Sequence, residues 1–268
     1  MKKRQFAIMG IFVFSVIFLV SAWKLAAYYT EGQEQEQAFR DLESIADRAS
    51  ETVADSVDSK TASPVQTEKP TEEETSAAIE YTALHDKNPD FWGWIKIEGT
   101  QLSYPVMYTP DDSEHYLRRD FDGNYSSRGV PFLDGACSDD CGNYIIYGHH
   151  MKDGTMFGSL LSYAKEDYWE AHPTIQLNTS EGQSTYTILA AFYAKVHNQE
   201  DSGVFRYYQY TDLTDPELFS EYVKQVKTAS LYDTGIDVQS GDQLLTLSTC
   251  SYHTKNGRFV VVARKQSP

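Results

Sequence analysis

The pattern of apolar and polar positions divides the chain into three parts, and the first part is almost wholly apolar. Residues 6–23 carry no charge and follow two lysines and an arginine at positions 2–4. As a helix this run spans about 27 Å, close to the thickness of a bilayer core. The basic flank predicts a cytoplasmic tail over residues 1–5 and a transmembrane signal-anchor over residues 6–26.

A cleaved signal peptide is the alternative interpretation of the same segment. Residues 20–22, Val-Ser-Ala, satisfy the small-residue rule of a cleavage site. The apolar run is longer than the core of a typical signal peptide, which favours the uncleaved anchor. In that case everything after the anchor lies outside the membrane.

The second part is polar and carries a weak helical pattern. Over residues 33–57 the apolar positions recur at alternating spacings of three and four. A stalk helix, a weakly self-associating helix and a marginal solvated helix are all compatible with this stripe. Residues 59–76 consist mostly of Ser, Thr, Pro, Glu and Lys, so we expect a flexible linker there. Residues 27–75 are therefore predicted to form an extracellular stalk and acidic linker.

From residue 77 onward, short apolar runs alternate with turn signals, as is typical of β-strands. A short helix comes first and should end near Asn88-Pro89, because the residue before proline avoids the helical conformation. Seven runs are expected to be strands: residues 93–97, 104–108, 144–147, 174–177, 185–196, 243–249 and 259–263. Seven or eight short strands with few helices predict a mainly β fold, a closed barrel, over residues 76–268.

One clear helix pattern interrupts the late strands, at residues 215–229. Thr214 and Glu217 have the spacing of a capping box, and Pro216 suits a first turn. One face of this helix is apolar and must pack on the barrel. It is formed by Leu218, Phe219, Tyr222, Val223 and Val226.

Charge narrows the possible partners of the 268-residue chain. Its formal net charge is −16 and its pI is about 4.8, which argues against a nucleic-acid partner. Much of the acid lies in residues 31–80, so we interpret it as solvation of an exposed segment.

Three cysteines are present, and two of them lie close together in the sequence. Cys137 and Cys141 could form a disulfide outside the cell, remain free thiols, or contribute half of a zinc site. Zinc is the least favoured because no second pair of ligands is evident. Cys250 is left unpaired, as a nucleophile must be.

Candidate chemistry gathers at the ends of three predicted strands. Cys250 closes the apolar run 243–249, His149 follows the run 144–147, and Arg258 opens the last strand. A thiol attacks as its thiolate, so it needs a basic or cationic neighbour, and an imidazole can then protonate a leaving amine. A guanidinium stays charged and can stabilise an oxyanion.

Two neighbouring residues are weaker candidates for the same roles. His150 adjoins His149, but adjacent residues on a strand point to opposite faces, so a metal would rarely bind both. Arg264 lies about 20 Å further along the strand from Arg258, so only one of them can reach Cys250.

The motifs around these residues resemble those of the sortases, cysteine transpeptidases of Gram-positive cell surfaces. Thr246-Leu247-Ser248-Thr249-Cys250 is similar to the TLxTC signature of that family, and Gly148-His149 and Arg258 match its histidine and arginine motifs. Residues 149–157, HHMKDGTMF, and residues 88–95, NPDFWGWI, resemble the class B subgroup. The resemblance covers residues 76 to 266.

The resemblance implies a sortase-type barrel and a division of labour in its site. Cys250, His149 and Arg258 would be catalytic, and Thr249 would lend a backbone N–H to the oxyanion. Ser248 and Tyr147 would line the peptide groove together with Thr249. No metal and no cofactor are expected.

The resemblance also implies substrates. A surface protein would be cleaved after Thr in a C-terminal, NPxTx-like sorting motif and passed to a peptidoglycan amine at the cell wall. A class B-type pilus sortase, which joins pilins through a lysine amine, is the alternative. A cysteine hydrolase and a non-catalytic wall-binding barrel are the less favoured hypotheses.

Overall fold

The computed structural model describes residues 2–57, 81–138 and 141–266. The predicted linker, residues 59–76, lies outside these ranges. The chain divides into two compact units, residues 1–42 and 43–268, which are described separately below.

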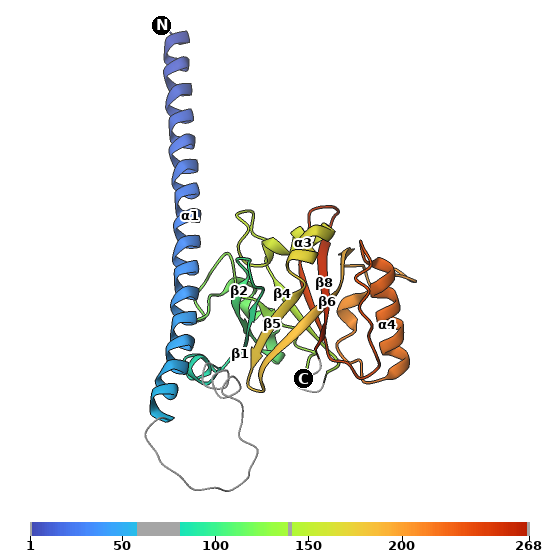
Figure 1. The fold of residues 1–268 in the computed structure, drawn as a ribbon. Coiled ribbons are helices and arrows are strands. Elements are labelled where there is room, and N and C mark those ends of the chain that lie inside the picture. Colours follow the sequence, from blue (N-terminus) through green and yellow to red (C-terminus); the bar gives the residue numbers. More distant parts are fainter. Residues whose placement is uncertain (1, 58–80, 139–140, 267–268) are drawn as a thin grey trace. The chain divides into compact units, whose positions relative to one another are not determined.

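The N-terminal unit is helical. It lies within α1, Lys2–Val57, so the apolar run and the predicted stalk pattern belong to one continuous helix (Figure 1). The apolar side chains of its first part are exposed, as Phe14 (78 %) illustrates. Within the described residues, one helical stretch, Ile8–Ile45, is long and apolar enough to cross a membrane, judged by its length and composition.

The second unit is built around a closed barrel of eight strands. The order around the barrel is β1-β2-β3-β4-β7-β8-β6-β5. The strands are β1 Phe91–Lys96, β2 Ser103–Met107, β3 Phe132–Leu133, β4 Asn143–Gly148, β5 Thr174–Thr179, β6 Gly182–Lys195, β7 Leu244–Cys250 and β8 Gly257–Lys265. The predicted mainly β barrel is confirmed, and β3 is the strand that the apolar pattern did not predict.

Short helices connect the strands. They are η1 Pro110–Asp112, η2 His115–Arg118, η3 Phe157–Ala164, α3 Glu166–Ala171, η4 Tyr207–Gln209 and α4 Pro216–Ala229. Residues 81–85 are also helical and precede the turn at Asn88-Pro89, where the predicted short helix should end.

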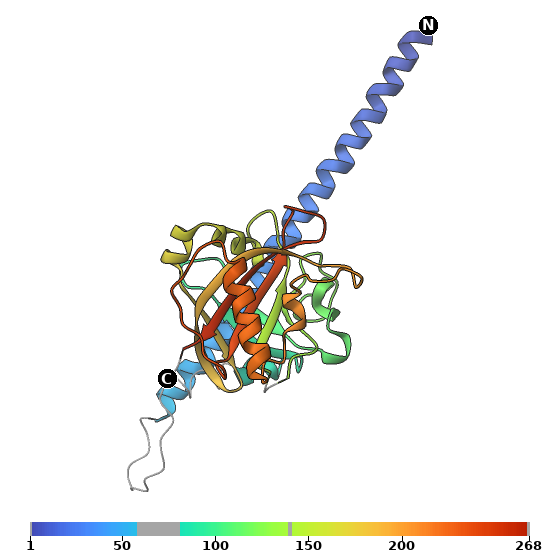
Figure 2. The same cartoon turned by 90° about the vertical axis from the view of Figure 1, so that its right-hand side faces the viewer.

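Helix α4 covers the outside of the barrel (Figure 2). Phe219, Tyr222 and Val226 pack with residues of β6, β7 and β8 in one buried cluster. Leu218, which was predicted to share this face, is instead 37 % exposed. Because α4 and the loops around it cover the outer face, both faces of the neighbouring strands are buried.

The N-cap of α4 differs from the prediction. The side chain of Asp215, not that of Thr214, accepts hydrogen bonds from the backbone N–H groups of Glu217 and Leu218, each at 2.9 Å. The Thr214 hydroxyl donates to Asp212 instead, at 2.7 Å. Asp215 is the favoured N-cap because its carboxylate accepts from two N–H groups of the first turn and adds negative charge at the helix N-terminus.

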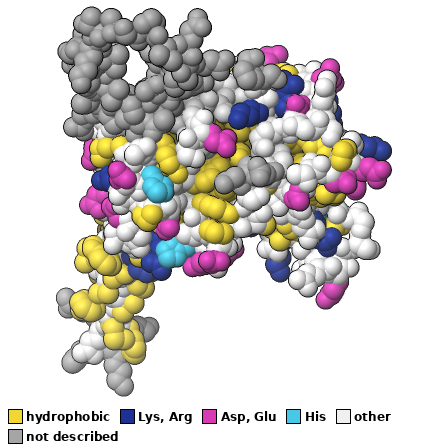
Figure 3. Space-filling view, turned by 90° about the horizontal axis from the view of Figure 1, so that it is seen from below, with side chains coloured by type: hydrophobic (Ala, Val, Ile, Leu, Met, Phe, Trp, Pro, Cys, Tyr) yellow, Lys and Arg dark blue, Asp and Glu magenta, His cyan; other side chains and the backbone are white. Residues whose placement is uncertain are grey.

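Strand β7 is buried at every position from Leu244 to Thr249 and becomes partly exposed only at Cys250. Its leucines are therefore interspersed with buried hydroxyl residues, Thr246, Ser248 and Thr249, each of which is hydrogen-bonded. On the face of the molecule seen from below, acidic and basic side chains are interspersed around apolar patches (Figure 3).

Candidate active site

Three strand ends bring the predicted catalytic residues together at one edge of the barrel. Strands β4 and β7 are parallel, with Gly148 opposite Thr249, so the next residues in each chain, His149 and Cys250, leave the sheet side by side. Strand β8 starts at the same edge, with Arg258 directly opposite Cys250. Neighbouring strands lie about 4.8 Å apart, which places all three residues within one small site.

Side-chain alternation puts these residues on the same face. Asn143 of β4 and Thr246 of β7 share a hydrogen bond of 2.8 Å, and both bond to the Tyr222 hydroxyl above them, so they point to the outer face. Every second residue points the same way. His149 and Cys250 are each an even number of positions further on, so they share this outer face.

His149 is fixed by a backbone carbonyl. Its Nε2 lies 2.8 Å from the carbonyl oxygen of Leu117. A carbonyl only accepts, so Nε2 carries a proton and Nδ1 is left to exchange a proton with the reaction. Burial lowers the pKa of His149; the Leu117 carbonyl opposes this effect and the charge of Arg118 adds to it. The ring is therefore neutral near pH 7.

His150 has a different, structural position. Its Nδ1 lies 3.0 Å from the backbone carbonyl of Cys250, and its ring packs against Tyr252 with centroids 5.5 Å apart. It therefore ties the loop after β4 to the end of β7. Of the two histidines, His149 lies on the face that strand alternation assigns to Cys250, whereas His150 bonds to the Cys250 backbone.

Arg258 is the arginine beside the thiol. Its guanidinium donates to the carbonyl of Gly257 at 3.1 Å, and its charge acts on the Tyr207 hydroxyl. Arg264 lies at the other end of β8, opposite Leu244, and pairs with Asp242 at 3.8 Å. The distance along the strand thus separates the two arginines as the sequence predicted.

The predicted groove residues of β7 are buried and anchored. The Ser248 hydroxyl lies 2.7 Å from the hydroxyl of Tyr207, and the Thr249 hydroxyl donates to the carbonyl of Gly148 at 2.8 Å. These bonds hold the strand end that carries Cys250 against both neighbouring segments.

The third predicted groove residue, Tyr147, lies opposite Ser248 on β4. Its hydroxyl donates to Asp134 at 2.8 Å, and its ring packs beside Phe132. Burial, followed by the charge of Asp134, raises the pKa of Tyr147 well above its ordinary value. The side chain is therefore a neutral, fixed wall of the site.

Tyr207 of η4 is a site residue that the sequence pattern did not reveal. Burial raises its pKa to about 12, while the hydrogen bond to Ser248 and the charge of Arg258 act in the opposite direction. The phenol therefore lies within electrostatic reach of Arg258 and stays protonated at neutral pH.

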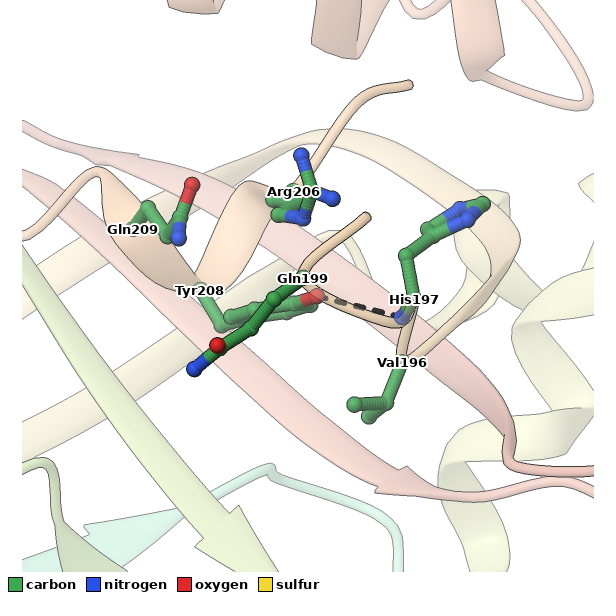
Figure 4. A pocket seen from close by; sticks show the side chains of 6 residues that line it. All are labelled: Val196, His197, Gln199, Arg206, Tyr208 and Gln209. Carbon is green, nitrogen blue, oxygen red and sulfur yellow. Dashed lines mark hydrogen bonds between the residues drawn. The ribbon is translucent and has the colours of Figure 1, made fainter. Parts of the chain in front are cut away.

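A pocket with a volume of about 430 Å³ adjoins this edge (Figure 4). It is lined by Val196, His197, Gln199, Arg206, Tyr208 and Gln209. The backbone N–H of Val196 bonds to Asn256 in the loop between Cys250 and Arg258, at 2.9 Å. The segment between β6 and α4 thus borders the loop that joins Cys250 to Arg258. The pocket lies in this segment, next to the candidate site.

The remaining two cysteines are free thiols in this structure. Cys137 and Cys141 are both buried, and their sulfurs lie 3.6 and 3.5 Å from the same carbonyl oxygen, that of Asn143. Across the described ranges, no group of three or more His, Cys, Asp or Glu side chains could hold a metal ion.

The chain resembles known proteins both in sequence and in structure. The profile of the sortase domain matches residues 95–266. Sortase B of Staphylococcus aureus is 30 % identical over 189 residues, a match that covers 69 % of this chain and 74 % of that protein. The solved structure of Clostridium perfringens sortase B has a TM-score of 0.62 and 32 % identity, and covers 69 % of this chain and 99 % of that one. A structure of the Staphylococcus aureus sortase B–substrate complex superposes with a TM-score of 0.68 at 24 % identity, over 89 % of this chain and 99 % of the other.

Proposed function

The chain belongs to the sortase family and is a class B cysteine transpeptidase, and from this premise we propose that it attaches exported proteins to the cell wall. The proposed substrate is a C-terminal sorting motif of the NPxTx type, cleaved after Thr. The proposed acceptor is an amine of peptidoglycan. The observation that carries the proposal is the register of β4, β7 and β8, which gathers His149, Cys250 and Arg258 on one face.

The first half of the reaction forms a thioester. His149 takes the thiol proton, and the Cys250 sulfur attacks the carbonyl carbon of the motif threonine. The C–N bond to the following residue then breaks, and His149 gives its proton to the leaving amine nitrogen. Neutral Nδ1 of His149 suits the first proton transfer, because Nε2 is engaged by the Leu117 carbonyl.

In the second half of the reaction, the acceptor amine is the nucleophile and the Cys250 thiolate is the leaving group. The acceptor amine attacks the thioester carbon, a new amide bond forms, and the Cys250 thiolate leaves while His149 takes the proton that the amine releases. In both halves the carbonyl oxygen becomes an oxyanion. Arg258, directly opposite Cys250, supplies a fixed positive charge for it, and the backbone N–H of Thr249 is the proposed second donor.

The peptide is proposed to lie against the buried end of β7. In this proposal Ser248, Tyr147 and the backbone of Thr249 are the floor, because the Thr249 side chain points to the opposite face of the sheet. The η4 segment with Tyr207 is the proposed wall. The likeness of this barrel to that of the Staphylococcus aureus sortase B–substrate complex is compatible with a substrate bound there. We further propose that residues 6–26 anchor the enzyme in the cytoplasmic membrane, with residues 1–5 in the cytoplasm and the barrel, residues 76–268, outside.

The test uses the full-length chain in detergent with NPxTx, SPxTx and LPxTx peptides. Each is incubated with and without diglycine, diaminopimelate or a lysine peptide, beside Cys250→Ala, and products are identified by mass spectrometry. We expect cleavage after Thr and an amine-linked product that the alanine variant does not form. A product with the lysine peptide alone would favour pilus assembly, and cleavage by Cys250→Ala would refute the proposal.

A further inference from the structure

Arg128 carries a charge in the interior of the barrel unit, away from the catalytic strands. Only 2 % of its side chain is exposed, and its Nη2 donates to Asp153 at 2.7 Å. A buried guanidinium is costly unless it is paired, and an apolar residue could fill the same space. A charge kept in such a place calls for a specific role, and its contacts indicate one.

The first set of contacts is with the loop that follows His149. Besides Asp153, the guanidinium donates through Nη1 to the hydroxyl of Thr155 at 2.6 Å. The loop is closed at its base, where the N–H of Phe157 donates to the carbonyl of His149 at 2.9 Å. Arg128 therefore holds the tip of a hairpin whose base is the candidate catalytic histidine.

The second set of contacts is made by the backbone next to Arg128 and involves η2, the helix that contains Leu117. The segment next to Arg128 packs on η2, where the N–H of Val130 donates to the carbonyl of Tyr116 at 3.1 Å. Gly129 has a φ of +61°, and a Cβ there would lie 2.6 Å from the carbonyl oxygen of Leu117. The segment that carries Arg128 therefore packs closely against Leu117, whose carbonyl oxygen lies 2.8 Å from Nε2 of His149.

The charge pair is present across the neutral range. Desolvation raises the pKa of Asp153, but the hydrogen bonds from Arg128 and Thr155 outweigh it, so the pKa lies below its ordinary value. The carboxylate also accepts from Thr155 at 2.7 Å through its other oxygen, which orders the loop tip internally.

We propose that Arg128 is a positioning residue of this enzyme, which aligns His149 with Cys250 by tying the loop after His149 to the segment that packs on η2. The proposal rests on the function proposed above. Arg128 does not touch the reacting atoms; it acts through the loop that begins at His149. Because small displacements of a catalytic group slow proton transfer strongly, the loss should appear in kcat and not in KM.

The main test compares Arg128→Met with Arg128→Lys in the full-length chain. Methionine keeps the volume and removes the charge, whereas lysine keeps the charge and loses the two-pronged contact. We expect kcat to fall about 10- to 100-fold for methionine, less for lysine, with KM for the peptide nearly unchanged. Arg119→Met is the matched control, since Arg119 lies on the adjoining segment and donates to Gly123, away from the loop.

A second readout does not depend on a substrate. The rate at which iodoacetamide alkylates Cys250, followed by mass spectrometry of its peptide, reports how well His149 activates the thiol. We expect Arg128→Met and Asp153→Asn to lower this rate to a similar extent, and the double variant to lower it no further. The buried thiols of Cys137 and Cys141 serve as internal references for intact folding.

These readouts separate positioning from stability. If Arg128 only stabilises the fold, Arg128→Met melts earlier but keeps kcat and the alkylation rate within about twofold of the parent at 25 °C, which overturns the proposal. If Arg128→Met does not fold, Asp153→Asn gives the same comparison with Arg128 intact. If the parent enzyme cleaves no peptide, the proposed function fails, and the alkylation rates alone decide the role of Arg128.

Discussion

The buried hydrogen bond between Tyr207 and Ser248 allows a quantitative prediction. The two hydroxyls are 2.7 Å apart, and each residue is 1 % exposed. Tyr207→Phe removes one partner and leaves the Ser248 hydroxyl buried without it. Such an orphaned group costs about 1–3 kcal/mol of unfolding free energy. For a domain of this size, each kcal/mol lowers Tm by about 2–4 °C.

The assay is thermal unfolding of four proteins: the parent, Tyr207→Phe, Ser248→Ala and the double variant. Because the double variant leaves no orphaned hydroxyl, we expect it to be more stable than the sum of the single changes predicts, by about 1 kcal/mol. Tyr125→Phe is the control, since Tyr125 is 77 % exposed and should unfold like the parent.

Two results would refute this reasoning. A Tyr207→Phe variant as stable as the parent would mean that water or another group satisfies Ser248. Additive effects in the double variant would mean that the two hydroxyls do not depend on each other.

Further predictions concern the three strand ends. Arg258→Met should lower kcat about 10²- to 10³-fold, with partial recovery in Arg258→Lys, while Arg264→Met stays at the parent rate in peptide-cleavage assays. Because burial lowers the pKa of His149 in the folded state, the unfolded chain binds more protons there. Folding stability should therefore fall as the pH drops below about 6.5, and a denaturant series should find this dependence weaker in His149→Gln. Gly148→Ala would place a Cβ 2.6 Å from the ring of Phe157, so we expect a loss of about 1–3 kcal/mol in urea unfolding; an unchanged midpoint would contradict the packing.

Much of the barrel followed from the sequence because it depends on local patterns, and the predicted site residues lie at strand ends that the register brings together. Strand β7 combines leucines with small hydroxyl residues and no charge because both of its faces are buried, and Cys250 marks the point at which burial ends. The preference for His149 over His150 followed from the motif, and strand alternation explains it. Pro216 marked the first turn of α4 correctly.

The sequence did not reveal contacts between residues that lie far apart in the chain. It also did not reveal contacts made by backbone groups, which every type of residue has. Tyr207 meets Ser248 across 41 positions, and no local pattern connects them. Leu117 acts through its backbone carbonyl, which any residue possesses. Strand β3 is two residues long, which is too short to show an alternation of apolar and polar positions. Thr214 and Asp215 both carry an oxygen suited to capping, so only the backbone conformation could choose between them.

The parallel pairing of β4 with β7 has a consequence for how the protein acquires its reactivity. Their ends meet across a sequence separation of 100 residues, as the contact between His150 and Cys250 measures. Closing a loop of that length costs about 4 kcal/mol of chain entropy before any contact compensates for it, and such long-range pairing forms slowly. Until these strand ends have met, the chain holds the Cys250 thiol without the His149 imidazole beside it. The nucleophile is complete only after β4 has paired with β7, so the reactivity of Cys250 during refolding reports when this long-range pairing forms.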